Sequence, residues 1–345
     1  MKNTKKSLRC PLVSLIVLNW NGKEIIKNCL NSLLKNTKYP NYKVIVVDNG
    51  STDGSPNLLE KEFGKKVDLI INKENLGFSK GMNIGIKYVL NKYNPKYVGL
   101  LNNDLLFPDK FWLQKIIEIM ERDKRIGVAT PIFIFPDGKV QKVGEKLSGN
   151  LALTMIKILP SLPEEKYEEK LHGIKEVDVF LGAAFIIRKE VMEKCGLLDE
   201  RYSPFLVEEV EYSFRIKKYK YKSVTVCDSK VIHLLGYSMR KLTQKDIKKD
   251  LFKFYVVARN TFLFSLEYYG FFKSLLITLP IITFAAFFRR KDKRKGLSFS
   301  NLGFQKALIK RIFLIPKAVK DAFVLKRKEK RNNTKSAGQI YLLLL

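Results

Sequence analysis

The sequence predicts an α/β fold with a mixed, mainly parallel central sheet, followed by an amphipathic helical region at the C-terminal end. From residue 12 to about residue 240, short β-rich apolar runs alternate with helix-periodic stretches. Several of these runs end in Asn, Asp or Gly, as parallel strands that end at a binding edge do. Beyond about Arg240 the alternation stops and Lys, Phe, Leu and Ile dominate. We therefore expect a domain boundary there.

The first half of the α/β region contains four predicted strands. They are VSLIVLN, KVIVVDNGS, DLIIN and YVGLLNND, which occupy residues 13–19, 43–51, 68–72 and 97–104. Apolar residues recur at three and four positions between 25 and 34, which predicts a helix with one apolar face. Further helices are expected around Gly81–Leu90 and from about Lys110 to Arg122. The order strand–helix–strand predicts crossover connections and a parallel sheet.

The second half has a looser pattern. We expect hairpins and loops over 132–149, a mobile charged insertion over 151–170, and a strand pair in VDVFLGAAFIIR. A short helix over Glu190–Gly196, a helix from near Glu208 and a strand in SVTVCDSKVIHL follow. The predicted organisation is thus a basic tail (1–11), an α/β domain (12–240, with halves 12–104 and 105–240) and a helical region (241–345). The N-terminal apolar run resembles a signal peptide, but it lacks a cleavage site and ends abruptly in NWNG, so we expect a buried strand.

The composition restricts the partners and cofactors. The chain has 345 residues, with 64 Lys and Arg against 34 Asp and Glu, and the resulting net charge of +30 predicts a polyanionic partner. No aromatic-stacking or recognition motif accompanies the charge, so we expect an anionic membrane surface and no nucleic acid. The four cysteines form no C-x-x-C pair, which favours reduced thiols in the cytoplasm. With only two histidines, a bound metal should rely mainly on oxygen ligands, as Mg²⁺ or Mn²⁺ does.

Polar residues end three of the predicted strands and form a candidate binding edge. Because ligands of open α/β sheets lie at the carboxyl ends of the strands, carboxylates and amides there can bind a base, a ribose or a divalent metal. Each turn alone is equally well explained by the ordinary turn preference of Asn, Asp and Gly, but three together favour a site. The candidates are Asn19 and Asn21; Asp48, Ser51 and Asp53; and Asn102, Asn103 and Asp104.

A glycine repeat lies between the second and third of these ends. Gly77, Gly81 and Gly85 recur every four residues at a loop-to-helix transition, where a backbone can approach a phosphate or sugar closely. Neither G-x-G-x-x-G after the first strand nor G-x-x-x-x-G-K-[ST] is present, which disfavours dinucleotide-binding and P-loop proteins.

Eight motifs in order resemble the family 2 glycosyltransferases with the GT-A fold, in particular their rhamnosyltransferase-like branch. The resemblance covers roughly residues 12–240 and is carried by LIVLNWNG, VVDNGSTDGS, NLGFSKGMNIG, LLNND, GAAFIIRKEV, GLLDERY, FLVEEVEYSFRIKKYKY and KVIHLLGYS. It implies an enzyme that moves one sugar from a nucleotide-diphospho-sugar to a glycan or lipid-linked acceptor. The expected donors include dTDP-, UDP- and GDP-sugars.

The resemblance also implies roles for individual residues. Asp48 and Asp53 are expected beside the base and ribose of the donor, and Asn75, Gly77 and Asn83 in the loop that lines the donor pocket. Asp104, in the position of the family's D-x-D motif, is expected to bind the metal that bridges the two phosphates, with Asn103 beside it. His233 matches a position that adds a nitrogen ligand or contacts the diphosphate.

The catalytic base departs from the family pattern. Family members carry E-D-x-D, whereas this chain has Glu208-Glu209-Val210-Glu211. The resemblance implies that Glu209 deprotonates the acceptor in an inverting displacement, with Glu208 as the alternative. Mutual repulsion of clustered carboxylates is expected to raise a pKa. The same residues also suit an acidic first helical turn in which Glu211 pairs with Arg215.

The C-terminal region has apolar faces bordered by basic runs. Ser274–Phe288 is uncharged but short for a membrane span and contains Pro280, and RRKDKRK follows it. Apolar residues at helical spacing between Leu302 and Phe323 lie among lysines, before KRKEKR. This pattern predicts interfacial helices on the inner face of the cell membrane, with a transmembrane hairpin or a packed helical subdomain as alternatives.

Two other functions remain open from the sequence. A processive polysaccharide synthase of the same superfamily would carry Q-x-x-R-W and several spanning helices, and neither is visible, since the only tryptophans are Trp20 and Trp112. A non-catalytic nucleotide-sugar or membrane-binding module is compatible with the E-E-x-E departure. Donor hydrolysis or transfer that depends on Mn²⁺ separates an enzyme from such a module.

Overall fold

The computed structural model describes residues 10–147, 149–158, 171–234, 247–287 and 309–327. These residues form two compact units. Unit 1 contains 10–146, 171–204 and 208–234, and unit 2 contains the rest, namely 147, 149–158, 205–207, 247–287 and 309–327. Most of the expected basic tail and insertion, all of RRKDKRK and most of KRKEKR lie outside the described residues. Unit 2 therefore takes in two short segments that the sequence division at residue 240 places in the α/β domain.

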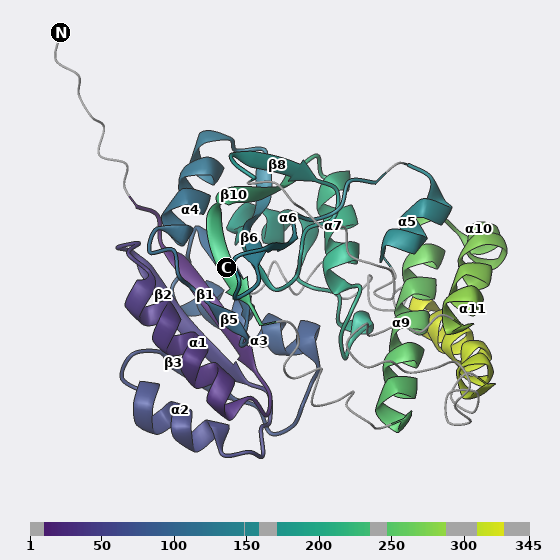
Figure 1. Ribbon diagram of the computed structural model, residues 1–345, viewed down its shortest axis with the longest axis horizontal. Helices are drawn as coiled ribbons and strands as arrows, with labels where there is room; N and C mark the ends of the chain where they lie inside the picture. Colours follow the sequence, from purple (N-terminus) through teal and green to yellow (C-terminus); the bar gives the residue numbers. More distant parts are fainter. Residues whose placement is uncertain (1–9, 148, 159–170, 235–246, 288–308, 328–345) are drawn as a thin grey trace, which may run out of the picture. The chain divides into compact units, whose positions relative to one another are not determined.

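Unit 1 is built on one mixed sheet with the strand order β3-β2-β1-β4-β9-β6-β10-β5, while β7 pairs with β6 and β8 with β10 (Figure 1). The pairs β1–β2, β1–β4, β2–β3 and β6–β10 are parallel, and the other pairs are antiparallel. This confirms the predicted fold class. The strands are β1 (Val13–Asn19), β2 (Tyr42–Asp48), β3 (Asp68–Ile71), β4 (Tyr97–Asn102), β5 (Leu105–Leu106), β6 (Ile126–Ile134), β7 (Val140–Lys142), β8 (Ile174–Val177), β9 (Ala184–Arg188) and β10 (Lys222–His233).

Helices cover both faces of the sheet. Side chains alternate along β1, so that Leu15 and Val17 pack on one face while Ile16 packs on the other. The first face buries apolar residues of α1 (Lys23–Asn36), α2 (Ser55–Phe63) and α4 (Trp112–Arg122). The second face buries residues of α3 (Phe78–Lys92), α6 (Lys189–Cys195) and α7 (Glu208–Lys218). Two-sided coverage explains why the central strands are continuous apolar runs.

The predicted helices α1, α3, α4, α6 and α7 are confirmed, whereas α2 is not among the predicted elements. Pro56 in the first turn of α2 is a typical helix start that the apolar pattern alone did not reveal. Strand β6 also differs from the expectation of hairpins and loops over 132–149, because it is a nine-residue buried strand that begins before this range. Its pairing with β7 does form one hairpin there.

Two further expectations are corrected. The described part of the presumed mobile insertion, residues 151–158, forms helix α5 (Leu151–Ile158). The stretch VDVFLGAAFIIR contributes to two strands, but these do not pair with each other. Strand β8 pairs with β10, and β9 inserts between β4 and β6. The two strands are therefore separated in the sheet by the long strand β10 and by β6.

Unit 2 is helical in the described residues. It contains α5, α9 (Ile247–Tyr268), α10 (Phe271–Lys273), the π-helical turn η2 (Ser274–Thr278), α11 (Leu279–Phe287) and a helix over residues 309–327. The buried hydroxyl of Ser265 bonds to those of Ser274 (2.8 Å) and Thr278 (2.7 Å), which joins α9 to η2. Within the described residues, no helix is both long and apolar enough to cross a membrane.

Candidate active site

The carboxyl ends of β1, β2 and β4 meet at one edge of the sheet. In the parallel register Asn19 pairs with Asp48, and Leu18 pairs with Asn102. Because the three strands are neighbours, the polar residues that follow them lie on adjacent loops. The structure thus brings together the three candidate strand ends.

Asn19 connects these three ends through its side chain. It is fully buried, its Nδ2 donates to Asp48 Oδ2 (2.8 Å), and its Oδ1 accepts from Asn103 Nδ2 (2.8 Å). The other oxygen of Asp48 accepts the Ser51 amide at 2.8 Å. Since both heteroatoms of the Asn19 amide are used, the Asp48 carboxylate and the Asn103 amide are held in fixed orientations.

Gly22, which the sequence analysis did not single out, supports the same network. A Cβ atom at this position would lie 2.5 Å from Asn103 Nδ2 and 2.9 Å from Asn19 Oδ1. Only glycine leaves these two amides in place. The signal in the sequence is the glycine that closes NWNG directly after the first strand.

The loops after β1 and β2 are tied to each other. The Asn21 amide donates to Ser51 Oγ (2.8 Å), and Asn21 Oδ1 accepts the Thr52 amide (2.7 Å). Asp53, which is exposed, accepts the Lys23 amide at 2.9 Å. Burial opposes ionisation of Asp53, but hydrogen bonds from Ser55 and from the Lys23 amide outweigh it and lower its pKa. Asp53 is therefore a carboxylate at neutral pH.

Asn49 holds the loop between β3 and α3 and was also missed from the sequence. Its buried amide donates to Asn75 Oδ1 (2.9 Å) and to the Gly77 carbonyl (3.1 Å), while its Oδ1 accepts from Asn72 (3.0 Å). Gly77 has φ +80°, and an added Cβ would lie 2.8 Å from Pro204 Cα. The sequence signal for Asn49 is its place directly after Asp48.

In α3, the helix that follows this loop, Asn83 and two glycines have structural roles. Asn83 donates to Leu198 O (2.8 Å) and Glu200 Oε1 (3.0 Å) and accepts the Leu198 amide (3.1 Å), so it clamps α3 to the segment that contains η1 (Glu200–Tyr202). A Cβ on Gly81 or Gly85 would lie 2.8 Å from Leu18 or 2.7 Å from Ile16. These two glycines serve close packing of α3 on β1, so the interpretation of the repeat as a phosphate loop applies at most to Gly77.

Asp104 and His233 form a pair beside these strand ends. β5 runs antiparallel to the end of β10, where Leu105 pairs with His233, and the Leu234 amide donates to Asp104 O at 3.0 Å. His233 Nε2 lies 3.5 Å from Asp104 Oδ1, and both side chains are largely buried. The His233 ring packs edge-on against Phe133, and its carbonyl accepts from Gln141 Nε2. The Phe133 ring thus packs against the imidazole, and the Gln141 bond holds the His233 backbone.

The carboxylate and imidazole of this pair suit a divalent cation. A carboxylate oxygen and an imidazole nitrogen 3.5 Å apart are two donors that Mn²⁺ accepts, and Mg²⁺ accepts the carboxylate. Among the described residues, no group of three or more His, Cys, Asp or Glu side chains gathers around one point. The remaining ligands of a cation here would have to come from a substrate or from water.

The first turn of α7 carries the carboxylates that the sequence analysis singled out. Glu211 pairs with Arg215 through two contacts, of 2.9 and 2.6 Å, and Arg215 also donates to the Cys195 and Leu197 carbonyls. This confirms the ion pair expected for an acidic first turn and gives Glu211 a structural role. Glu208 is buried at 8% exposure.

Glu209 is a partly buried carboxyl with a raised pKa. Burial raises its pKa, and Lys142 opposes this effect only in part. Desolvation is thus the leading cause, whereas the sequence analysis predicted repulsion among clustered carboxylates. The side chain of Glu209 lies along Gly182, where an added Cβ would be 3.3 Å from Glu209 Cβ. Its backbone carbonyl accepts from Ser213 Oγ at 2.6 Å. A pKa raised above the ordinary range of a carboxyl favours the role of a general base.

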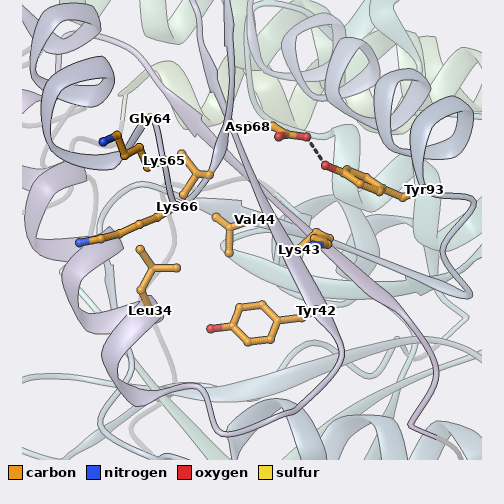
Figure 2. A pocket seen from close by; sticks show the side chains of 10 residues that line it. Leu34, Tyr42, Lys43, Val44, Gly64, Lys65, Lys66, Asp68 and Tyr93 are labelled. Carbon is orange, nitrogen blue, oxygen red and sulfur yellow. Dashed lines mark hydrogen bonds between the residues drawn. The ribbon is translucent and has the colours of Figure 1, made fainter.

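A cavity of about 360 Å³ lies elsewhere, around the starting ends of β2 and β3 (Figure 2). Tyr42 and Lys43 begin β2, Lys66 and Asp68 lie where β3 begins, and the Tyr93 hydroxyl donates to Asp68 (Figure 2). The site residues follow the other ends of these strands. This basic cavity is therefore separate from the candidate active site.

Comparisons with known proteins give the family of the chain. The family model "Glycosyl transferase family 2" matches residues 14–196. The chain is 27% identical over 206 residues to low-salt glycan biosynthesis hexosyltransferase Agl10 of Haloferax volcanii, which covers 60% of this chain and 62% of that protein. It is 23% identical over 240 residues to N-acetylglucosaminyl-diphospho-decaprenol L-rhamnosyltransferase of Mycobacterium tuberculosis, which covers 66% of this chain and 77% of that protein.

A solved structure supports the fold. The structure of GalNAc-T7 with UDP, GalNAc and Mn²⁺ is similar with a TM-score of 0.51 at 16% identity, and the match covers 79% of this chain and 54% of that chain. For most of the curated relatives, the matched stretch is less than two thirds of the relative's own length.

Proposed function

Since this chain belongs to glycosyl transferase family 2, we propose that it transfers one sugar from a nucleotide-diphospho-sugar to a glycan or lipid-linked acceptor, with inversion at the anomeric carbon. The observation that carries the proposal is the amide of Asn19. It joins the Asp48 carboxylate and the Asn103 amide at the carboxyl edge of the sheet, one residue from Asp104. A polar edge of this kind suits a nucleotide.

The donor's nucleoside would lie over the ends of β1 and β2. Asp48 and Asp53 would accept hydrogen bonds from the ribose hydroxyls and from the base. Asn19, Asn21 and Ser51 fix the loops that present these carboxylates, and Asn102 ends β4 at the same edge of the sheet. Asn75, Gly77 and Asn83 act indirectly in this scheme, by shaping the loop and helix on the other side of the donor pocket. The hydrogen bonds that tie these residues together support a preformed pocket.

Asp104 and His233 would hold a Mn²⁺ or Mg²⁺ ion against the donor's two phosphates. Such an ion, when bound, neutralises negative charge on the departing nucleoside diphosphate. The proposal is supported by the 3.5 Å approach of the two side chains and by their burial. Asn103 would orient the Asp104 backbone through its bond to Asn19.

Glu209 would act as the general base. Its carboxylate takes the proton of the acceptor hydroxyl, the hydroxyl oxygen forms a bond to the anomeric carbon, and the bond from that carbon to the diphosphate oxygen breaks on the opposite face. The nucleoside diphosphate leaves with the electron pair. The raised pKa of Glu209 supports this role, while Glu208, which precedes it on α7, is the alternative base.

Donor identity is the first point to test. The motifs that resemble the rhamnosyltransferase-like branch favour dTDP-rhamnose as the donor, and a rhamnosyltransferase is among the relatives, at 23% identity. Thermal shifts of the purified chain with dTDP-, UDP- and GDP-sugars, each with and without Mn²⁺, are expected to show one preferred nucleotide. Product formation with that donor should stop on chelation and return on adding Mn²⁺. A chain that binds donors but never releases nucleoside diphosphate would instead be a binding module.

The helical unit 2 would bring the enzyme to an anionic membrane surface on the cytoplasmic side, where a lipid-linked acceptor is found. Side chains of Phe272, Leu276 and Phe313 are 75%, 72% and 77% exposed, and Lys310 and Lys317 are exposed near the last of these. Exposed apolar residues beside lysines suit an interfacial region. Flotation with vesicles that contain phosphatidylglycerol should recover the chain, whereas phosphatidylcholine vesicles should recover less.

A matched pair of variants tests the membrane surface. Phe272→Glu together with Leu276→Glu should abolish flotation at low salt. Ile174→Glu, which changes an exposed apolar residue of unit 1, should leave flotation unchanged. Flotation of the double variant at the wild-type level would overturn this part of the proposal.

A further inference from the structure

The segment that leads into α7 has an unusual backbone. Leu206 and Val207 have φ values of +71° and +78°. Such values are unfavourable for residues with a side chain and most of all for a β-branched one such as Val207. Residues in this region persist only where their surroundings hold them. The question is therefore which contacts hold this segment.

Asn260, in the middle of α9, is one such contact. Its side chain is fully buried, and its Nδ2 donates to the carbonyls of both Phe205 (3.1 Å) and Leu206 (2.8 Å). All three residues belong to unit 2. A single amide thus spans two successive carbonyls of the segment, and this fixes the peptide plane between them.

A second residue fixes the orientation of that amide. Arg259 donates from Nε (2.9 Å) and from its terminal nitrogen (2.7 Å) to Asn260 Oδ1. With the oxygen occupied by a guanidinium, the NH₂ group must face the carbonyls. The Phe205 ring also packs edge-on against Phe252 of α9, at 6.2 Å between centroids. The segment is therefore anchored on α9 at two points.

The chain continues from Val207 directly into Glu208 and Glu209, the first two residues of α7. We propose that Asn260 is a positioning residue for Glu209: it holds Leu206 and Val207 at the positive φ values that set the direction in which the chain enters α7. This inference rests on the proposed role of Glu209 as the base. Without the amide, Leu206 and Val207 are free to relax to negative φ, which turns the first turn of α7 and moves the carboxylate.

The test uses Asn260→Asp. The aspartate has the same shape and keeps an oxygen for Arg259, but it cannot donate to the two carbonyls. A misplacement of about 1 Å costs about 100-fold in rate, so kcat should fall by about 10- to 100-fold, while the KM for the donor stays within about twofold. Amide hydrogen exchange at residues 206–209 should become faster, and this readout does not depend on activity.

Two further variants keep the outcome clear. Thr261→Val removes a buried hydroxyl on the same helix that has no hydrogen-bond partner among the described residues, and it should leave kcat and exchange unchanged. Leu206→Gly removes the conformational penalty of a positive φ, so adding it to Asn260→Asp should restore much of the lost kcat. If Asn260→Asp alone does not fold, kcat of this double variant still tests whether the conformation of Leu206 positions Glu209.

The failure of this inference differs from the failure of the base assignment. If Asn260→Asp lowers thermal stability but leaves kcat and the exchange of 206–209 unchanged, Asn260 merely stabilises unit 2 and the inference is overturned. Failure of Leu206→Gly to recover kcat also overturns it. If Glu209→Gln turns over normally, the base assignment fails whatever the Asn260 variants show.

Discussion

The His233 imidazole lies 3.5 Å from the Asp104 carboxylate, although one follows β4 and the other ends β10. The antiparallel pairing of β5 with the end of β10 brings them together. Asp104 directly follows Asn103 at the sheet edge that also carries Asn19 and Asp48. His233 reaches this edge because the end of β10 pairs with β5, which begins after Asp104. The pair thus joins a residue of the first part of unit 1, before β5, to a residue at the end of β10.

Asp104→Asn should weaken Mn²⁺ binding by at least about tenfold, because an amide replaces a charged oxygen ligand. His233→Gln should weaken it less, since the carboxylate remains. Isothermal titration of Mn²⁺ in the presence of nucleoside diphosphate measures both effects without turnover. Asp137→Asn, at an exposed carboxylate that pairs with Lys139, is the control and should bind Mn²⁺ as the wild type does. Equal Mn²⁺ affinity in all four proteins would remove the proposed metal site.

Glu209→Gln should reduce kcat by about 10² to 10⁴, the usual contribution of a general base. Binding of the donor nucleotide should change by less than about threefold, because the base contacts the acceptor. Steady-state kinetics and nucleotide titration on the same preparation measure the two quantities. Glu208→Gln is the matched control on the same helical turn. A large loss in Glu208→Gln with a small one in Glu209→Gln would reassign the base to Glu208.

Glu209 should also destabilise the fold as the pH rises. Burial raises its folded-state pKa above the ordinary value of 4.5, so the protonated form is favoured in the native state. Below pH 4.5 Glu209 is protonated in both the folded and the unfolded protein, so it does not lower the free energy of unfolding. As the pH rises through the folded-state pKa, this stability is lost. The Tm of Glu209→Gln relative to wild type should therefore increase from pH 4 to pH 8. Glu211→Gln, which breaks the ion pair with Arg215, should instead lower Tm at pH 8.

Much of the candidate site could be predicted because parallel strands share an edge. Once the strands that end at Asn19, Asp48 and Asn102 are recognised, the βαβ order predicts that they are parallel and end at the same edge of the sheet. Individual hydrogen bonds could not be predicted in this way. Asn49 and Gly22 occupy ordinary turn positions in the sequence, and only the folded loops show that one bonds to the 72–77 loop and the other leaves space for Asn103.

The second half of the fold was harder to predict for a physical reason. Strand β6 contains Gly127 and Pro131, two residues that usually argue against a central strand. Pro131 pairs with Val226 next to an irregularity in the β6–β10 register, where a missing amide hydrogen is tolerated. The contact of Asp104 with His233 depends on the long-range pairing of β5 with the end of β10, so local patterns do not reveal it. The Glu211–Arg215 pair, by contrast, is local and follows from helical spacing.

Gly22→Ala should weaken nucleotide binding through a single steric contact. The new methyl group would lie 2.5 Å from Asn103 Nδ2 and would push that amide away from Asn19. Loss of such a buried hydrogen bond costs about 1–3 kcal/mol, equivalent to about a 5- to 150-fold change in the nucleotide dissociation constant if the pocket depends on it. Asn103→Ala removes the amide that the methyl group strikes, so the two substitutions should not be additive. Titration of nucleoside diphosphate into both single variants and the double variant gives the coupling energy. Additive losses would mean that Gly22 acts on the pocket by another route, for example through the start of α1.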